Sequence, residues 1–181
     1  MKINFILLST LVLFAFSCKN NTKTEDISKK IRKVEAYYHR VNGVIDATVG
    51  YTGGNTENPT YDDVCNGNTG HAEAVRIEFD PDIVTYQDLL KHFFRIHDPT
   101  SQDRQGNDTG SQYRSAIFYY SEQQRKEAEK EIERLNNTRT YKKSIVTGIS
   151  PAIEFYPAEE YHQRYQEKNP HGYCHIDLNL A

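Results

Sequence analysis

The chain has 181 residues, a formal net charge of -3 and a hydrophobic content of 37%. This length suggests one domain with enough residues to bury a sizeable core, and the composition suits a soluble globular body. The small net charge argues against a nucleic-acid-binding protein, which would carry a clear excess of basic residues.

The first residues of the chain predict a targeting segment. Lys2 supplies a positive charge, and the run Ile3–Phe16 is almost wholly apolar but too short for an ordinary membrane-spanning helix. The run ends in Ala15–Cys18, which is similar to a bacterial lipoprotein signal whose cysteine becomes the acylated first residue. We therefore expect a signal peptide over residues 1–17 and a lipid on Cys18 that anchors an exported protein to a cell-envelope membrane. The alternative is a plain secretory peptide with an incidental cysteine.

The rest of the chain predicts a polar tether over residues 18–33, followed by one domain over residues 34–181. Hydrophobic spacing, caps and breakers predict helices over Val34–Val41, Tyr86–His97, Ser121–Leu135 and Pro157–Gln166, and strands over Val44–Tyr51, Ala72–Phe79, Tyr113–Tyr120 and Ser144–Ser150. Helices and strands that mix without strict alternation predict an α+β fold, here a two-layer sandwich of helices packed on a mixed sheet.

Two long polar loops, 52–70 and 97–110, are where functional side chains should lie. The first leads into a strand that begins near Glu73, and the second leads into one that begins near Tyr113. Glu73 would share the inward face of its strand with Val75 and Ile77, and a carboxyl group in such surroundings tends to stay protonated and can donate a proton. The alternative is a solvated glutamate at the end of a strand.

The cysteines and histidines predict neither a disulfide scaffold nor a metal site. With Cys18 lipidated, Cys65 and Cys174 remain, and their spacing fits no zinc motif. Cys65 is expected to be a small buried side chain. Four histidines could suggest a metal site, but no two have ligand spacing on a helix that carries a carboxylate; they are His71, His97, His162 and His175.

Eight short motifs, in order and with matching spacing, resemble the A class of peptide methionine sulfoxide reductases, which reduce the S epimer of methionine sulfoxide. The motifs are Gly50–Gly54, Asn58–Tyr61, Val64–Gly67, Thr69–Glu73, His97–Pro99, Arg104–Asp108, Gln112–Ala116 and Asn169–Cys174. The resemblance runs from about Val34 to the end of the chain. It implies a ferredoxin-like core in the sandwich and a repair enzyme for oxidised methionine.

The resemblance also implies a role for several residues. In this chemistry a thiolate attacks the sulfoxide sulfur, the oxygen is protonated, and a second thiol resolves the resulting sulfenic acid as a disulfide. Glu73 matches the proton donor, Tyr61 and Tyr113 match the hydroxyl groups that hold the oxygen, and Asp108 matches a supporting carboxylate. Cys174 matches the resolving cysteine on a mobile tail.

The same resemblance implies the partners. The substrate would be methionine sulfoxide, free or within proteins, and the disulfide would be reduced by a thioredoxin-like dithiol. No bound cofactor, metal or nucleic acid is implied, and a monomer is expected.

The chain departs from the family where the nucleophile should be. The family places Gly-Cys-Phe-Trp-Gly or a close variant just before the residues that match Val34 and Glu35; without a gap, the nucleophile falls on Lys30 and the two aromatic residues fall on Ile31 and Arg32. The chain has no tryptophan. The tether also occupies the place of the preceding strand, so the sheet is expected to lack it.

Two interpretations remain open from the sequence. In the first, the chain is a membrane-tethered reductase that has lost its catalytic segment and is impaired or inactive. In the second, it is a non-catalytic relative that binds oxidised methionine. The retained residues favour the first interpretation, because a binding protein needs neither a proton donor nor a resolving thiol; they are Glu73, Tyr61, Tyr113 and Cys174.

Overall fold

A computed structural model describes residues 4–9, 34–105, 108–168 and 180–181 of the chain. Besides a helical segment at residues 34–38, its elements are β1 (Asn4–Ser9), β2 (Val44–Thr52), α2 (Tyr61–Cys65), β3 (Ala72–Phe79), α3 (Tyr86–Ile96), β4 (Arg104–Gln105), β5 (Asp108–Thr109), η1 (Ser111–Tyr113), β6 (Ala116–Tyr119), α4 (Glu122–Asn137), β7 (Gly148–Pro151), β8 (Phe155–Pro157) and α5 (Tyr165–Lys168).

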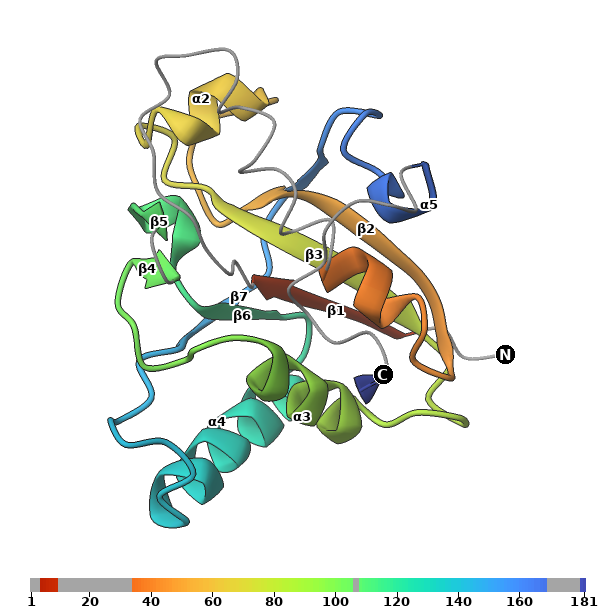
Figure 1. Cartoon of the computed structure of the whole chain (residues 1–181), viewed down its shortest axis with the longest axis vertical. Coiled ribbons are helices and arrows are strands. Elements are labelled where there is room, and N and C mark those ends of the chain that lie inside the picture. The colour runs from red at the N-terminus through yellow and green to blue at the C-terminus, as the bar shows by residue number, and fades with distance from the viewer. Residues whose placement is uncertain (1–3, 10–33, 106–107, 169–179) are drawn as a thin grey trace.

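The main sheet has six strands in the order β7-β6-β1-β3-β2-β8. The pairs that β1, β2, β3, β6 and β8 form with one another are antiparallel, and β7 runs parallel to β6, so the sheet is mixed. Helix 34–38 lies across β2 and β3, while α3 and α4 pack together beside β6 and β7 (Figure 1). The predicted α+β fold with helices packed on a mixed sheet is confirmed.

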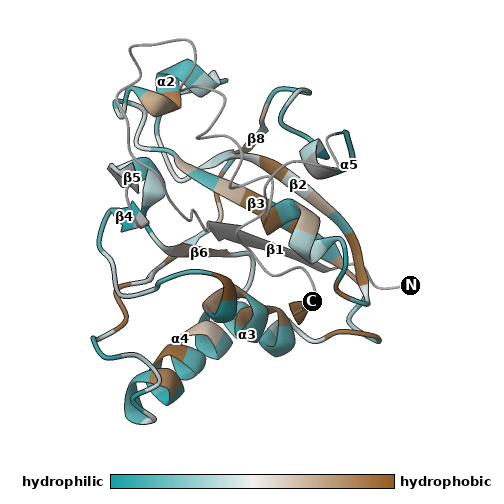
Figure 2. Cartoon of the chain, in the orientation of Figure 1, coloured by the Kyte–Doolittle hydropathy of each residue, from teal (hydrophilic) through white to brown (hydrophobic). Residues whose placement is uncertain are grey.

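The main core lies between the sheet and the helices because strands and helices turn matching apolar faces toward each other. Along β3, Val75, Ile77 and Phe79 are buried on one face. They join the apolar face of α3, which includes Leu89 and Phe93, in one buried cluster. Figure 2 shows the apolar residues concentrated on the central strands and on the facing sides of the helices. A smaller cluster covers the other face of the sheet, where Ala72, Ala74, Ala116, Phe118 and Phe155 meet.

The strand β1 comes from an unexpected part of the chain. Asn4–Ser9 falls within the run predicted as a signal peptide, yet in the structure it pairs with both β3 and β6. The strand expected to be missing is the one directly before Val34, and residues 10–33 lie outside the described part of the chain. The sheet nevertheless holds β1 between β3 and β6. The physical reason is that β3 and β6 each offer a row of backbone groups that need partners.

Three local predictions differ from the structure. Tyr113 ends the 3₁₀ turn η1, and the following strand begins only at Ala116. The strand predicted from Ser144 is the shorter β7. The helix predicted from Pro157 is wrong, because residues 155–157 instead form β8 against the edge of β2, where the sheet satisfies their backbone.

Candidate active site

The carboxyl group of Glu73 is buried at the start of β3. Since alternate residues of a strand face opposite sides of the sheet, Glu73 shares a face with Val75 and Ile77. None of the three is more than 2% exposed. The predicted inward-facing carboxyl group is confirmed, and the alternative of a solvated strand-end glutamate is wrong.

Two tyrosines from separate segments approach this carboxyl group. Tyr61 is the first residue of α2 and Tyr113 is the last of η1; their side chains are 4% and 5% exposed and belong to the same buried cluster as Val75. Burial, followed by the electrostatic effects of Glu73, Cys65 and Tyr113, raises the pKa of Tyr61 well above its ordinary value. The Tyr61 hydroxyl therefore keeps its proton and can donate a hydrogen bond. The effects of Glu73 and Tyr113 on Tyr61 place these three side chains near one another. The expectation that they converge with Asp108 in one pocket stays a prediction, because the side chain of Asp108 is not described.

A third tyrosine, Tyr51, was not among the predicted site residues. It lies directly opposite Glu73 in the pairing of β2 with β3, and residues in that relation share a face of the sheet. Its side chain is 2% exposed and its hydroxyl donates a hydrogen bond to Glu159 Oε2 at 2.9 Å. Burial, followed by the effects of Glu159 and Glu73, raises its pKa. Tyr51 belongs to the Gly50–Gly54 motif, which marked it without giving it a role.

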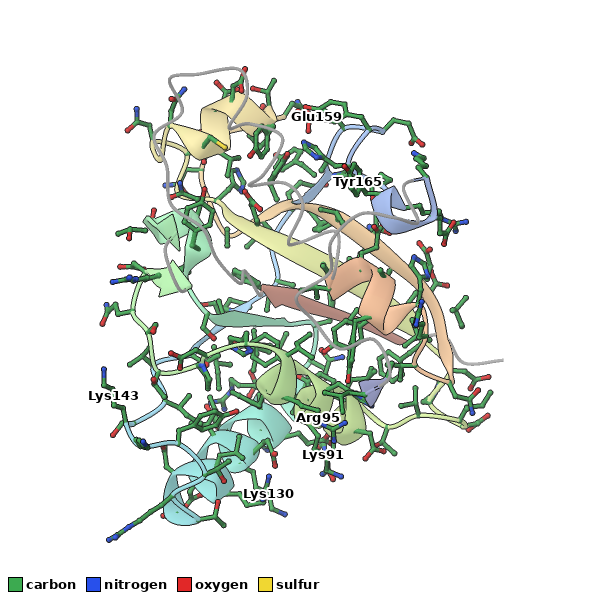
Figure 3. The ribbon with its side chains drawn as sticks, in the orientation of Figure 1. Lys91, Arg95, Lys130, Lys143, Glu159 and Tyr165 are labelled. Atoms are coloured by element: carbon green, nitrogen blue, oxygen red, sulfur yellow. The ribbon has the colours of Figure 1, made fainter. Side chains whose placement is uncertain are left out.

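Glu159 joins this wall of the site to α2. Its Oε1 atom accepts a hydrogen bond from the backbone N–H of Tyr61 at 2.8 Å, and its Oε2 atom accepts from Tyr51. Partial burial opposes ionisation, but the hydrogen bond from Tyr61 and those that accompany it lower the pKa of Glu159. The ring of His162 packs on Tyr61 with 4.9 Å between ring centroids. Glu159 lies beside α2 in Figure 3. No sequence motif marked Glu159, because this region was expected to be helical.

A capping box fixes the short helix that carries Tyr61. The Thr60 side chain accepts a hydrogen bond from the Asp63 backbone N–H at 3.3 Å, and Asp63 Oδ2 accepts one from the Thr60 backbone N–H at 2.9 Å. These two bonds satisfy backbone donors that a helix N-terminus otherwise leaves exposed. This helix lies within a loop that was predicted to be irregular, so the sequence analysis missed it.

The buried histidines hold loops in place. His71 accepts from the Gly54 N–H at 3.2 Å through Nδ1 and donates to the Thr56 carbonyl at 2.8 Å through Nε2. His97 donates to the Phe93 carbonyl at 2.7 Å, and burial lowers its pKa to about 4, so it is neutral. Within the described part of the chain, no group of three or more histidine, cysteine or acidic side chains is arranged to hold a metal ion.

Several predicted residues lie outside what the structure describes. Cys18, Lys30 and Cys174 are not among the described residues. The backbone of Asp108 forms part of β5, but the description does not extend to its side chain. Cys65 is described and lies half-buried at the end of α2, where its carbonyl accepts a hydrogen bond from the Gln112 side chain at 3.3 Å.

The described groups suit protonation of a polar oxygen. A buried carboxyl group stands among protonated tyrosine hydroxyls, in surroundings where hydrogen bonds are stronger than in water. Such a site can hold an oxygen atom by hydrogen bonds and donate a proton to it as it leaves.

Comparison with known proteins gives the family. The family model described as peptide methionine sulfoxide reductase matches residues 33–181. The protein named peptide methionine sulfoxide reductase MsrA of Methanothermobacter thermautotrophicus is 54% identical over 143 residues, which cover 79% of this chain and 85% of that protein. Its namesake from Acinetobacter baumannii is 53% identical over 146 residues, covering 80% of this chain and 83% of that protein.

Solved structures agree with the sequence comparison. Mxr1 from Saccharomyces cerevisiae in reduced form has a TM-score of 0.80 and 32% identity, covering 98% of this chain and 91% of that one. Methionine sulfoxide reductase A of Corynebacterium diphtheriae has a TM-score of 0.75 and 33% identity, covering 96% and 78%. Mxr1 in complex with Trx2 has a TM-score of 0.57 and 26% identity, covering 91% and 85%. The chain belongs to the peptide methionine sulfoxide reductase family.

Proposed function

We propose that this chain reduces methionine S-sulfoxide, free or within proteins, with Glu73 as the proton donor and the Tyr61 and Tyr113 hydroxyls as ligands of the sulfoxide oxygen. The observation that carries the proposal is the burial of Glu73 on the face that also holds Tyr51, Tyr61 and Tyr113. Asp108 would support the site as a further carboxylate. Glu159 would position two of the tyrosines through its hydrogen bonds.

The proposed reaction balances with thiols as the source of electrons. An attacking thiol takes the oxygen from the substrate sulfur, so the thiol becomes a sulfenic acid and the sulfoxide becomes a thioether. Glu73 would protonate the oxygen as its bond to the substrate sulfur breaks. A second thiol, proposed as Cys174, would then displace water from the sulfenic acid to form a disulfide. A thioredoxin-like dithiol would reduce that disulfide; the yeast relative solved in complex with Trx2 supports this class of reductant.

The chain has no cysteine at the position that matches the attacking thiol. The matching position carries Lys30, whose ammonium group has no lone pair to attack sulfur, and no tryptophan is present to pack on the substrate methyl group. General acid catalysis contributes typically about 10²–10⁴-fold and does not replace the covalent step. We therefore propose that the chain as it stands turns over slowly and that a cysteine at position 30 restores the rate.

The test compares the chain with a variant in which Lys30-Ile31-Arg32-Lys33 becomes Cys-Phe-Trp-Gly, using dithiothreitol and a peptide that contains methionine S-sulfoxide. We expect turnover in the variant and little in the parent. Cys18→Ser, Cys65→Ser and Cys174→Ser in the parent identify the source of any residual turnover. Fast turnover by the parent, abolished by one of these substitutions, would show that a different cysteine attacks. No turnover in either protein would overturn the proposed function.

The alternative of a non-catalytic protein that binds oxidised methionine is not favoured. The matched relatives are named as reductases, and the match covers most of their length. A binding site also gains nothing from a carboxylic acid that is buried next to hydroxyl groups, because burying such a group has a cost in free energy.

We further propose export and acylation at Cys18, supported by the apolar run that ends in Ser17 and Cys18. Within the described residues, no helix has the length and apolar character that a membrane span requires. Mass spectrometry of the mature N-terminus tests this proposal. A chain that keeps Met1 or begins at a residue other than Cys18 would refute it.

A further inference from the structure

A second buried carboxyl group, that of Glu35, lies apart from the candidate site and binds the backbone of a distant segment. Glu35 belongs to helix 34–38 and is 1% exposed. Its Oε1 atom accepts a hydrogen bond from the backbone N–H of Arg164 at 2.8 Å. Among the residues that the structure describes, its Oε2 atom is buried and has no hydrogen-bond partner. A buried carboxylate is normally paired on both oxygens, so this arrangement suits a neutral carboxylic acid.

The segment that Glu35 contacts is held at two points. Arg164 has a φ of 49°, in the left-handed region that a non-glycine residue seldom adopts, and its backbone N–H donates to Glu35 in this conformation. One residue earlier, the Gln163 side chain accepts from the Val49 N–H at 3.1 Å and donates to the Val49 carbonyl at 2.8 Å. Gln163 therefore extends the pairing of β8 along the edge of β2. The segment leads directly into α5 and, further along the sequence, to Cys174.

Charged groups from each neighbouring element face Glu35. A cavity of about 290 Å³ beside it is lined on β2 by Asp46 and on the 158–164 segment by Glu160 and Arg164. Arg164 Nη2 lies 3.6 Å from Asp46 Oδ1. Glu167 on α5 also acts on Glu35 electrostatically. Directly after its helix, His39 Nε2 lies 4.0 Å from Asp46 Oδ1. Three acidic groups, Asp46, Glu160 and Glu167, thus lie around Glu35, and Glu160 is itself paired with Lys168 at 3.0 Å. The cavity gives water a route toward Glu35.

We propose that Glu35 is a positioning residue that acts as a proton-dependent clasp, in which the neutral carboxyl group holds the Arg164 backbone against helix 34–38 and its ionisation releases the segment toward α5. The bearing of this clasp on catalysis rests on the proposed role of Cys174, because the released segment precedes that cysteine in the chain.

The direction of the pH dependence follows from burial. Burial raises the pKa of Glu35 from 4.5 to about 7, although the hydrogen bond from Arg164 opposes it; Glu167 and Asp46 raise it further. In an open state the carboxyl group is hydrated and has its ordinary pKa. The closed state is therefore favoured below pH 4.5 and loses population as the pH rises to about 7. Each unit of difference in pKa changes the closed-to-open ratio tenfold, so the whole change is on the order of 10².

Amide hydrogen exchange of Arg164 tests the clasp in the full chain, without any need for turnover. NMR would follow this amide from pH 5 to pH 8, with rates corrected for the intrinsic pH dependence of exchange. We expect its protection to fall by at least about tenfold in the parent chain over this range. Amides of β3, such as Ile77, report global unfolding, in which the opposite pH dependence of His97 offsets that of Glu35, so their protection should change much less than that of Arg164.

Matched variants isolate the carboxyl group of Glu35. Glu35→Gln keeps the shape and an acceptor oxygen but cannot ionise, so the Arg164 protection should become independent of pH. Glu160→Gln removes a charge from the same cavity and should leave the pH dependence in place. Constant protection of Arg164 in the parent would overturn the clasp, as would a pH dependence that persists in Glu35→Gln. Should Glu35→Gln fail to fold, the parent measurement still decides. A failed turnover assay would overturn the proposed function without affecting this result.

Discussion

At the scale of single residues, the molecule places two carboxyl groups, those of Glu73 and Glu159, in different surroundings. Glu73 is enclosed among apolar and tyrosine side chains, whereas Glu159 receives hydrogen bonds from Tyr61 and Tyr51 that stabilise its charge. One side chain is thereby suited to give a proton and the other to hold its neighbours in place. The surroundings of each acid follow from its place in the chain: Glu73 lies at the start of β3, and Glu159 follows β8.

Glu73→Gln should remove the proton donor while keeping the size of the side chain. In the variant that carries cysteine at position 30, we expect kcat/KM for methionine S-sulfoxide to fall by about 10²–10⁴-fold. The melting temperature should change little, because glutamine fills the same space without ionising. An unchanged rate would show that another group protonates the oxygen.

His97 should make the protein sensitive to acid. Burial lowers its pKa from 6.5 to about 4, so the unfolded chain binds a proton between these values while the folded chain does not. Stability therefore falls as the pH drops from 6.5 to 4, by about 3 kcal/mol from this residue. His97→Gln should remove this contribution, so the parent should gain stability relative to the variant as the pH rises from 4 to 6.5, as measured by urea unfolding of both proteins.

The comparison must be made between variants, because Glu35 acts in the opposite direction. Its raised pKa makes the folded chain bind the extra proton, so its contribution to stability is lost as the pH rises from 4.5 to about 7. The two residues partly cancel in the parent. An identical pH slope in the parent and in His97→Gln would contradict the assignment to His97.

At the scale of elements, hydrogen bonds at the N-terminus of helix α2 fix the segment that carries Tyr61. The five-residue helix α2 is too short to be stable alone, so its capping box and the bond from Tyr61 to Glu159 set its position. Thr85 caps the longer helix α3 in a similar way, because its side chain accepts a hydrogen bond from the Asp88 N–H at 3.1 Å. Helix α3 carries none of the site residues. The two threonines therefore form a matched pair for substitution.

Thr60→Ala and Thr85→Ala should each lower the free energy of unfolding by about 1 kcal/mol, the usual cost of a lost N-cap. Only Thr60→Ala should also reduce activity in the variant with cysteine at position 30, because it frees the helix that positions Tyr61. Urea unfolding and steady-state kinetics measure the two effects. Equal losses of activity in both variants would mean that stability, and not the position of Tyr61, controls the rate.

At the scale of the whole molecule, the strand β1 and the proposed signal peptide use the same residues. Asn4–Ser9 pairs with β3 on one side and β6 on the other. Removal of residues 1–17 would leave two strands of the sheet without their shared neighbour, which exposes backbone groups and invites aggregation. The proposed processing would therefore change the fold by removing β1.

A chain that begins at Cys18 should have a lower melting temperature and a greater tendency to aggregate than a chain that begins at Asn4. The expected loss is a large share of a total stability of about 5–15 kcal/mol, since an interior strand is missing. Calorimetry and light scattering on both proteins, made without lipid, measure the difference. Equal melting temperatures would show that β1 contributes little to the fold.

The sequence by itself determined the fold class and the inward-facing carboxyl group of Glu73. The alternation in Ala72–Phe79 located β3 and its inward carboxyl group, and the apolar face of Tyr86–Ile96 located α3. These predictions succeeded because both patterns depend on a residue and its near neighbours. The motifs indicated the family because each is a short stretch of sequence that can be recognised without the structure.

Only the tertiary structure decided where the remaining segments lie. Phe155–Pro157 became a strand because the edge of β2 was available to pair with it. Asn4–Ser9 became a strand because β3 and β6 left a gap of its width. Tyr51 and Glu159 belong to the site through a hydrogen bond between residues that are more than a hundred positions apart in the sequence. Pairing partners and burial depend on residues far apart in the sequence, and no local pattern records which of them will meet.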